Sequence, residues 1–174
     1  MTAETLRPRS ITLRFLAEPT DVNFGGKVHG GAVMRWIDQA GYTCAAGWTG
    51  TYCVTVYLGG LHFLGPIRVG ELVELRALVI RTGRTSVDIA IEVYAGDPKS
   101  RERRRTGHCV IVFVALDEEA RPMAVPPWTP KGELDLALEA YAGRLGELRK
   151  QMDQEMERRL ATLTQSFQLE TSGS

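Results

Sequence analysis

The sequence lacks a surplus of charge of either sign, because lysine and arginine together number 21 and so do aspartate and glutamate. Nucleic acids and anionic membranes select proteins with a basic surplus. The balance therefore argues against both as the main partner. It also removes a repulsion that keeps chains apart in solution, which suits a protein that buries surface in an oligomer.

Other scarce features narrow the choice further. No apolar run is long enough to span a bilayer, and the first ten residues lack the apolar stretch of a signal peptide. The three cysteines form no CxxC pair, and the three histidines show no metal-binding spacing with acids or thiols. We therefore expect a cytoplasmic protein with reduced thiols, no metal and no membrane contact.

What stands out among the residues present is the stretch 21–47. A glycine-rich loop leads into a mostly apolar helix, predicted from about His29 to Ala46, which carries Asp38 in its middle. An ionised carboxylate held away from water is costly unless it has partners. From the helix alone, Asp38 is either a functional group or a structural acid, one that caps a nearby backbone group or pairs with Arg35 or with an arginine of another subunit.

The remaining periodicity predicts an α+β architecture. Alternating apolar residues indicate strands over 10–17, 52–64, 71–82, 85–95 and 107–116, with a bulge at Gly59-Gly60 and a tight turn at Gly83-Arg84. We interpret 96–105 as a solvated charged loop, with phosphate binding by its arginines as the alternative. One helix cannot cover so long an antiparallel sheet, so another subunit should bury part of it.

The C-terminal quarter has its own pattern. Four prolines between 122 and 130 indicate a stiff linker, and beyond them an apolar stripe predicts an amphipathic helix over about 133–164. The stripe consists of Leu134, Leu138, Tyr141, Leu145, Leu148, Met152, Met156, Leu160 and Leu163. We expect this helix to lie on another subunit or across the domain edge. The predicted division is a domain at 1–126, then linker, helix and flexible tail at 127–174.

The loop and the central helix together offer chemistry. A helix start at Gly30-Gly31 presents unpaired N–H groups and the positive end of the dipole, and glycine lets a substrate approach closely. Asn23 supplies an amide and Asp38 a carboxylate, which makes an acyl-transfer site without serine, cysteine or metal plausible. The alternatives are that Asn23 is a turn residue and that the glycines mark tight packing.

A resemblance to a known family rests on several segments in order. They are Asn23-x-x-Gly26-x-x-His29-Gly30-Gly31, Asp38, Val54-Thr55-Val56, Phe63-x-x-Pro66-x-x-x-Gly70-Glu71 and Gly83-Arg84-Thr85-Ser86-Val87. Over about residues 10–126 the chain resembles the hotdog-fold acyl-CoA thioesterases, in particular the branch of YciA-type enzymes and cytosolic long-chain acyl-CoA hydrolases. The resemblance implies a long antiparallel sheet wrapped around a central helix.

The same resemblance implies an activity, the hydrolysis of fatty acyl-CoA to free acid and CoA. Asp38 would be general base or nucleophile, Asn23 would assist from the opposing subunit of a dimer, and amides at Gly30-Gly31 would polarise the carbonyl. No cofactor is implied, because the CoA moiety is part of the substrate. The family habit also implies a homo-oligomer with shared sites, a trimer of dimers.

The resemblance further implies CoA-binding residues in two segments, and the matching positions are Phe63, Arg68, Gly83, Arg84, Thr85 and Ser86. We add His29 to them, with a packed or hydrogen-bonded loop histidine as the alternative. Two rival functions stay open. One is a hotdog module that binds acyl-CoA or CoA as a sensor without hydrolysis, and the other is a hotdog dehydratase, whose usual His-Asp arrangement His29 and Asp38 lack.

Overall fold

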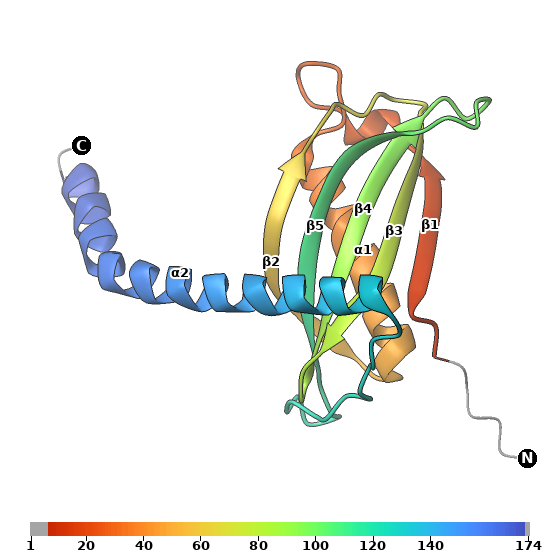
Figure 1. Ribbon diagram of the computed structural model, residues 1–174. Coiled ribbons are helices and arrows are strands. Elements are labelled where there is room, and N and C mark those ends of the chain that lie inside the picture. Colours follow the sequence, from red (N-terminus) through yellow and green to blue (C-terminus); the bar gives the residue numbers. More distant parts are fainter. Residues whose placement is uncertain (1–6, 173–174) are drawn as a thin grey trace, which may run out of the picture.

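The computed structural model describes residues 7–172, and its centre is one antiparallel sheet curled around a helix (Figure 1). The strands are β1 (Ser10–Leu16), β2 (Cys53–Phe63), β3 (Leu72–Thr82), β4 (Ser86–Gly96) and β5 (Arg104–Ala115). Their order across the sheet is β1-β3-β4-β5-β2. The predicted sequence of one strand, one helix and four strands is confirmed, and it leaves β2 at an edge of the sheet.

The helix α1 (Gly30–Thr49) covers the inner face of this sheet. Its buried residues recur at helical spacing and include Val33, Ile37, Ala40 and Cys44. Gly41 lies on the same side, where a Cβ atom would come within 2.7 Å of the Phe113 ring on β5. The helix therefore approaches the sheet closely at the turn that follows Asp38.

Both ends of α1 have identifiable caps. His29 is the N-cap, and Gly50 ends the helix in the left-handed conformation with a φ of 75°. The predicted end at Ala46 was wrong by one turn, because Gly47 and Trp48 continue the helix. Trp48 is fixed from outside, since its Nε1 donates a hydrogen bond of 3.0 Å to the carbonyl of Pro126.

The turns within the sheet follow the sequence. The predicted bulge is confirmed by a shift of the β2–β5 register between Gly59 and His62. The predicted tight turn is confirmed as well, because the N–H of Gly83 donates to the carbonyl of Ser86 at 2.9 Å. β3 and β4 are thereby joined at the end of the sheet away from the α1 start.

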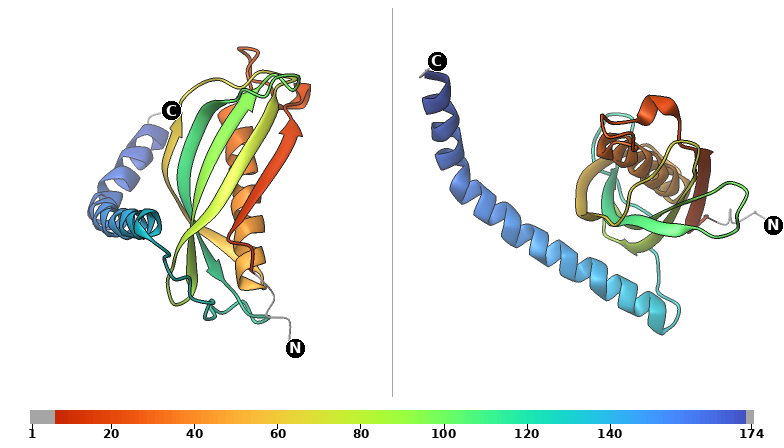
Figure 2. Two further views of the ribbon diagram at one scale, coloured as in Figure 1. Left: turned by 45° about the vertical axis from the view of Figure 1, so that its right-hand side comes forward. Right: turned by 90° about the horizontal axis from the view of Figure 1, so that it is seen from above.

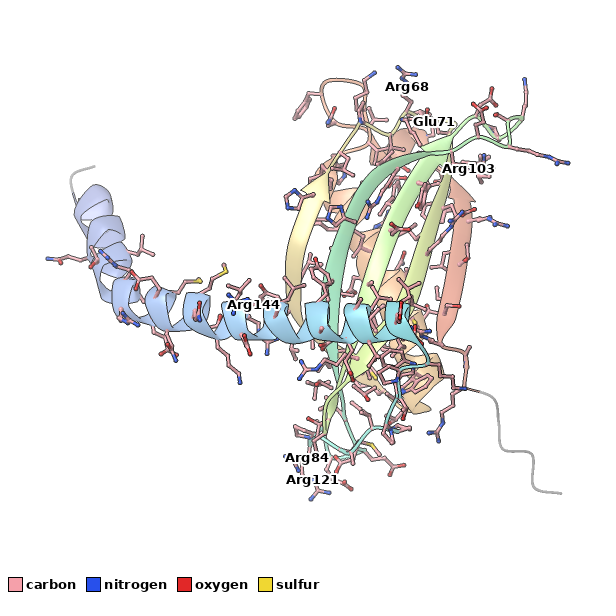
Figure 3. The ribbon with its side chains drawn as sticks, viewed as in Figure 1. Arg68, Glu71, Arg84, Arg103, Arg121 and Arg144 are labelled. Carbon is pink, nitrogen blue, oxygen red and sulfur yellow. The ribbon has the colours of Figure 1, made fainter. Side chains whose placement is uncertain are left out.

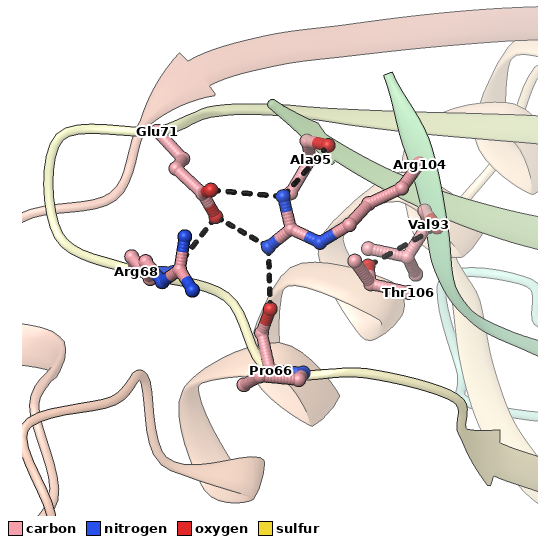
Figure 4. A network of polar contacts seen from close by, with 7 residues as sticks. All are labelled: Pro66, Arg68, Glu71, Val93, Ala95, Arg104 and Thr106. Atoms are coloured by element: carbon pink, nitrogen blue, oxygen red, sulfur yellow. Dashed lines mark hydrogen bonds and ion pairs between the residues drawn. The ribbon is translucent and has the colours of Figure 1, made fainter. Parts of the chain in front are cut away.

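The charged loop is shorter than predicted, because β5 begins at Arg104 and not at 107. Arg104 is not simply solvated: its guanidinium donates to both carboxylate oxygens of Glu71, at 2.8 and 2.7 Å, and to the carbonyl of Pro66 (Figure 4). A bidentate pair of this kind is a strong, oriented contact. It ties the start of β5 to the loop between β2 and β3.

This contact makes acid stability testable. The hydrogen bond from Arg104 lowers the pKa of Glu71 below its usual 4.5. A carboxylate with a depressed folded-state pKa stabilises the fold above its unfolded pKa and loses that effect as pH falls through the folded value. We expect the urea midpoint of the native chain to exceed that of Glu71→Gln at pH 6 and to approach it by pH 3. A gap that stayed constant with pH would contradict this.

The first half of the second long helix, α2 (Glu133–Ser172), lies on the outer face of the sheet, and the helix then extends past β2 (Figures 1 and 2). Leu138, Ala142 and Leu145 pack there against Ile80 and Val110. Of the two expected positions, on another subunit or across the domain edge, the first is wrong for the first half of the helix, which lies across its own sheet. The helix also runs past the predicted end at 164.

The rest of the C-terminal prediction is tested only in part. Thr171 and Ser172 of the predicted flexible tail belong to α2, while Gly173 and Ser174 lie outside the described residues. The domain division at residue 126 stays a prediction. Within residues 7–172 no helix is both long and apolar enough to cross a membrane.

Candidate active site

Asp38 lies on a side of α1 that points away from the core and toward the edge strand β2. Met34, Asp38 and Tyr42 share this side at intervals of four residues, and all three are exposed in the single chain. In the single chain the Asp38 carboxylate is therefore not held away from water, although the helix that carries it is mostly apolar. The alternative pairing with Arg35 was wrong, because Arg35 forms its ion pair with Asp21 at 3.0 Å.

The partner of Asp38 is Thr55, a residue that sequence analysis assigned to a motif but to no role. The Thr55 hydroxyl on β2 donates a hydrogen bond of 2.5 Å to Oδ1 of Asp38. This bond orients the carboxylate and leaves Oδ2 without a described partner. The sequence does show a threonine between Val54 and Val56 in a strand with alternating apolar residues. Its contact with Asp38 depends on how α1 lies against β2, which the sequence pattern does not give.

Exposed apolar side chains surround this pair. On α1 these are Met34 and Tyr42, 43% and 38% exposed; Val56 on β2 is 51% exposed, and Tyr52, directly before β2, is 59% exposed. β2 also offers one free edge of hydrogen-bonding groups, because it is the last strand of the sheet. Several exposed apolar side chains beside an unpaired strand edge are typical of a protein–protein interface.

The start of α1 is open in the way that the sequence predicts. Nδ1 of His29 accepts a hydrogen bond of 3.0 Å from the N–H of Ala32, so His29 caps the helix. The N–H groups of Gly30 and Gly31 donate to no other described residue. A Cβ atom on Gly31 would lie 3.1 Å from His29 Nδ1, so glycine keeps this cap undisturbed. Unpaired amides at a helix start attract negative charge.

A hollow of about 380 Å³ adjoins this helix start. It is lined by Val28, Gly30 and Val33 from the loop and α1, and by residues from Phe63 to Ile67. The Phe63 ring approaches to 3.4 Å of the position that a Cβ of Gly30 would occupy. The structure therefore brings Phe63 together with the helix start, whereas its contact with CoA stays a prediction.

Asn23 and Asp38 do not meet within one chain. The Asn23 side-chain oxygen accepts hydrogen bonds from the N–H groups of Gly25 and Lys27, at 2.9 and 3.2 Å, and so forms the turn that was the alternative interpretation. Its amide nitrogen donates to no described residue. Asp38 lies eight residues after the helix start at Gly30, which is about 12 Å along the axis.

The residues expected to bind CoA fall into two groups at opposite ends of the molecule. Arg68 lies beside the α1 start, and Arg84 lies at the far end, in the turn between β3 and β4 (Figure 3). The 11 residues of β3 separate them, about 35 Å of extended chain. Gly83, Thr85 and Ser86 share the far end with Arg84. The structure therefore does not bring the two predicted segments together in one chain.

The comparisons with known proteins identify the family. The model of the thioesterase superfamily matches residues 25–102. VdlD of Helicobacter pylori is 32% identical over 144 residues, covering 83% of this chain and 81% of its own. The acyl-CoA thioester hydrolase YciA of Escherichia coli is 35% identical, covering 67% of this chain and 90% of its own. The chain therefore belongs to the thioesterase superfamily, and it is a thioesterase.

Solved structures confirm the predicted hotdog fold. An acyl-CoA hydrolase of Staphylococcus aureus, solved with butyryl coenzyme A and coenzyme A, has a TM-score of 0.80 at 24% identity, covering 90% of this chain and 95% of that chain. A hexameric, broad-specificity acyl-coenzyme A thioesterase, solved as an aspartate-to-alanine variant, has a TM-score of 0.63 at 30% identity. The match covers 78% of this chain and 96% of that chain.

Proposed function

We propose that this thioesterase hydrolyses acyl-CoA, with Asp38 as the catalytic carboxylate. The observation that carries the proposal is the Asp38–Thr55 pair, a carboxylate oriented by a hydroxyl and placed between the apolar sides of α1 and β2. Support for the substrate class comes from YciA, an acyl-CoA thioester hydrolase at 35% identity. The solved aspartate-to-alanine variant of a 30% identical thioesterase is in keeping with a working aspartate.

The reaction needs few groups because a thioester carbonyl is a good electrophile. As general base, Asp38 takes a proton from water while the water oxygen bonds to the carbonyl carbon. The C–S bond then breaks, and the thiolate of CoA receives the proton that Asp38 holds. As nucleophile, the carboxylate itself attacks the carbon, and the C–S bond breaks to release the CoA thiolate. Water then cleaves the resulting anhydride to give the acid and restore Asp38, and the second proton of the water goes to the thiolate. Both routes give free acid and CoA without a metal or a further cofactor.

The site is divided between two subunits. The unpaired N–H groups at Gly30 and Gly31 are suited to polarise the thioester oxygen, and the amide of Asn23 lies on the loop that leads to them. Asp38 of the same chain is about 12 Å further along the helix. One carbonyl cannot contact both, so the proposed site pairs Asn23 and the helix start of one chain with Asp38 and Thr55 of the other.

A dimer through the free edge of β2 fits these requirements. A twofold axis beside β2 would continue the sheet, bury the exposed apolar residues around Asp38 and set the two α1 helices side by side. Because paired edge strands are antiparallel, one end of the first chain meets the opposite end of the second. Arg68 of one chain and the Gly83–Ser86 turn of the other would then approach the same substrate. Hexamers among the neighbours favour association of such dimers.

The test is the release of free thiol from a panel of acyl-CoA substrates of different chain lengths, measured with a colorimetric thiol reagent. We expect turnover with at least one chain length at neutral pH. A chain that binds acyl-CoA by calorimetry and releases no thiol from any substrate would contradict hydrolysis. That outcome would instead favour the sensor.

Thr55 offers a sharper test of how the carboxylate is held. In Thr55→Val the shape of the side chain is kept and the hydrogen bond to Asp38 is lost, so kcat should fall about tenfold while KM changes little. Thr55→Ser keeps the hydroxyl and should stay close to the native rate. Equal kcat values for the native chain and Thr55→Val would show that the bond has no catalytic role.

A further inference from the structure

We infer that α2 is an exchanged arm: its second half, from residue 150 onward, lies on the outer sheet face of the partner subunit, antiparallel to the partner's α2. This inference rests on the β2-edge dimer of the proposed function. Four apolar residues, Met152, Met156, Leu160 and Leu163, are called the distal stripe below.

The distal stripe continues the surface that already holds α2 in place. In the first half of the helix, Leu138, Ala142 and Leu145 face the chain's own sheet. The helix then passes β2 and leaves the sheet (Figures 1 and 2). The distal stripe follows at the same spacing, and its four side chains are 57%, 65%, 61% and 54% exposed. A helix with so much exposed apolar surface gains stability by covering it.

The surface that would receive the stripe is present on every copy of the chain. A groove of about 730 Å³ lies between the first half of α2 and the outer sheet face. Its apolar lining includes Leu78, Ala90 and Val110 from the sheet and Leu134, Leu138 and Tyr141 from α2. Leu134 and Tyr141 are 74% and 47% exposed, so the groove has room for further apolar side chains.

Three pairs of apolar residues in α2 are symmetric about the point between Leu148 and Arg149, whereas the mirror position of Leu138 is Arg159. Leu134 and Leu163 lie equally far from that point, and so do Tyr141 and Met156, and Leu145 and Met152. In two antiparallel helices that cross there, each of these pairs lies at the same height. In such an antiparallel pair, the first half of one α2 therefore lies beside the distal stripe of the other α2.

The centre of this pattern lies where a dimer axis would pass. The Arg149 guanidinium is 4.9 Å from the centre of the Tyr57 ring, and Tyr57 adjoins Leu58, the middle residue of β2. A twofold axis that pairs the β2 edges near their middle therefore also relates the two α2 helices. A single twofold rotation would therefore both pair the free edges of the two β2 strands and cover the distal stripes of the two α2 helices.

The curvature of α2 agrees with this arrangement. Seen from above in Figure 2, the helix bends beyond β2 toward the side of the sheet on which α1 lies. Long helices curve around the surface that they cover, with the convex side toward solvent. A partner sheet that continues from β2 would occupy the concave side of this bend.

Disulfide trapping tests the arm directly. In the variant Tyr141→Cys with Met156→Cys, the two thiols of one chain are 15 residues apart, about 22 Å along a helix, which is far beyond disulfide reach. In the exchanged pair they are neighbours. The native Cys44, Cys53 and Cys109 are buried and do not compete. We expect mild oxidation to convert most chains to covalent dimers on a non-reducing gel.

Further cysteine variants test how the two α2 helices are aligned against each other. Tyr141→Cys with Leu163→Cys displaces one thiol by about 10 Å along the helix, so it should cross-link at least tenfold more slowly. Leu148→Cys alone lies near the axis and should link to its own copy. Met156→Cys alone should not, and its rapid self-linking would indicate parallel helices and overturn the inference. Equal rates for the matched and displaced pairs would overturn it too.

Thiol release and solution mass, measured on the same unoxidised samples, separate this inference from the proposed function. An oligomer that hydrolyses acyl-CoA and fails to link residues 141 and 156 overturns the arm and leaves the function standing. A linked dimer that releases no thiol supports the arm and contradicts the function. A monomeric mass overturns the arm.

Discussion

Replacing Asp38 with asparagine should lower kcat for acyl-CoA hydrolysis by about 100- to 10,000-fold, the usual contribution of a positioned general base. Asparagine has nearly the same shape and keeps an oxygen that can accept the Thr55 hydrogen bond. It loses only the basic oxygen that takes the proton from water, or that attacks the carbonyl if Asp38 is the nucleophile. KM should change little, because the carboxylate acts mainly in the transition state.

The measurement is thiol release under saturating acyl-CoA, with circular dichroism and solution mass as controls for folding and assembly. Thr55→Ser is the control: it changes the residue that contacts Asp38 but keeps the hydroxyl, so its kcat should stay close to the native value. If Asp38→Asn retained more than a tenth of the native kcat, Asp38 would be a structural acid. The proposed mechanism would then be wrong.

The second large effect concerns the fold beneath the site. Gly41→Ala should lower the free energy of unfolding by about 1–3 kcal/mol, because the added Cβ comes within 2.7 Å of the buried Phe113 ring and 3.0 Å of Ile111. Neither neighbour can move freely, since both are 1% exposed. The displaced helix would also shift Asp38, so kcat should fall with stability.

Gly143→Ala provides a control with the same chemical change. Gly143 lies in α2 and a Cβ there would have no atom within 4 Å, so the variant should be neutral or gain up to about 1 kcal/mol from helix propensity. Urea unfolding of both variants measures the difference. Similar midpoints for the two would show that α1 does not depend on close approach at Gly41.

Local pattern predicted the elements well because each buries one face. Alternation in the strands and three- or four-residue spacing in the helices follow from that geometry. The end of α1 escaped prediction, since a glycine inside a helix costs only about 1 kcal/mol and a distant contact offsets it. That contact is the hydrogen bond from Trp48 to Pro126, 78 residues away in sequence.

The sequence predicted which residues belong to the candidate site better than it predicted how they are arranged in space. Asp38, Gly30 and Gly31 were recognisable from spacing, but the exposed side of α1 depends on which helix face meets the sheet. Thr55 and Arg104 were missed for one reason: each acts through a residue far along the chain, at 17 and 33 positions. Such contacts depend on how one helix or strand is aligned against another, and no local sequence pattern encodes that alignment.

In the proposed oligomer each site combines Asp38 of one subunit with Asn23 of another. The most direct measurement co-expresses two differently tagged chains, Asp38→Asn and Asn23→Ala, purifies the mixed oligomer and compares its rate with each inactive parent. If the site is shared, each mixed dimer has one fully native site of its two, so about half of the native kcat should return in a purified mixed dimer and about a quarter in a randomly mixed hexamer. A mixed oligomer as inactive as its parents would place both residues in one chain and contradict the account.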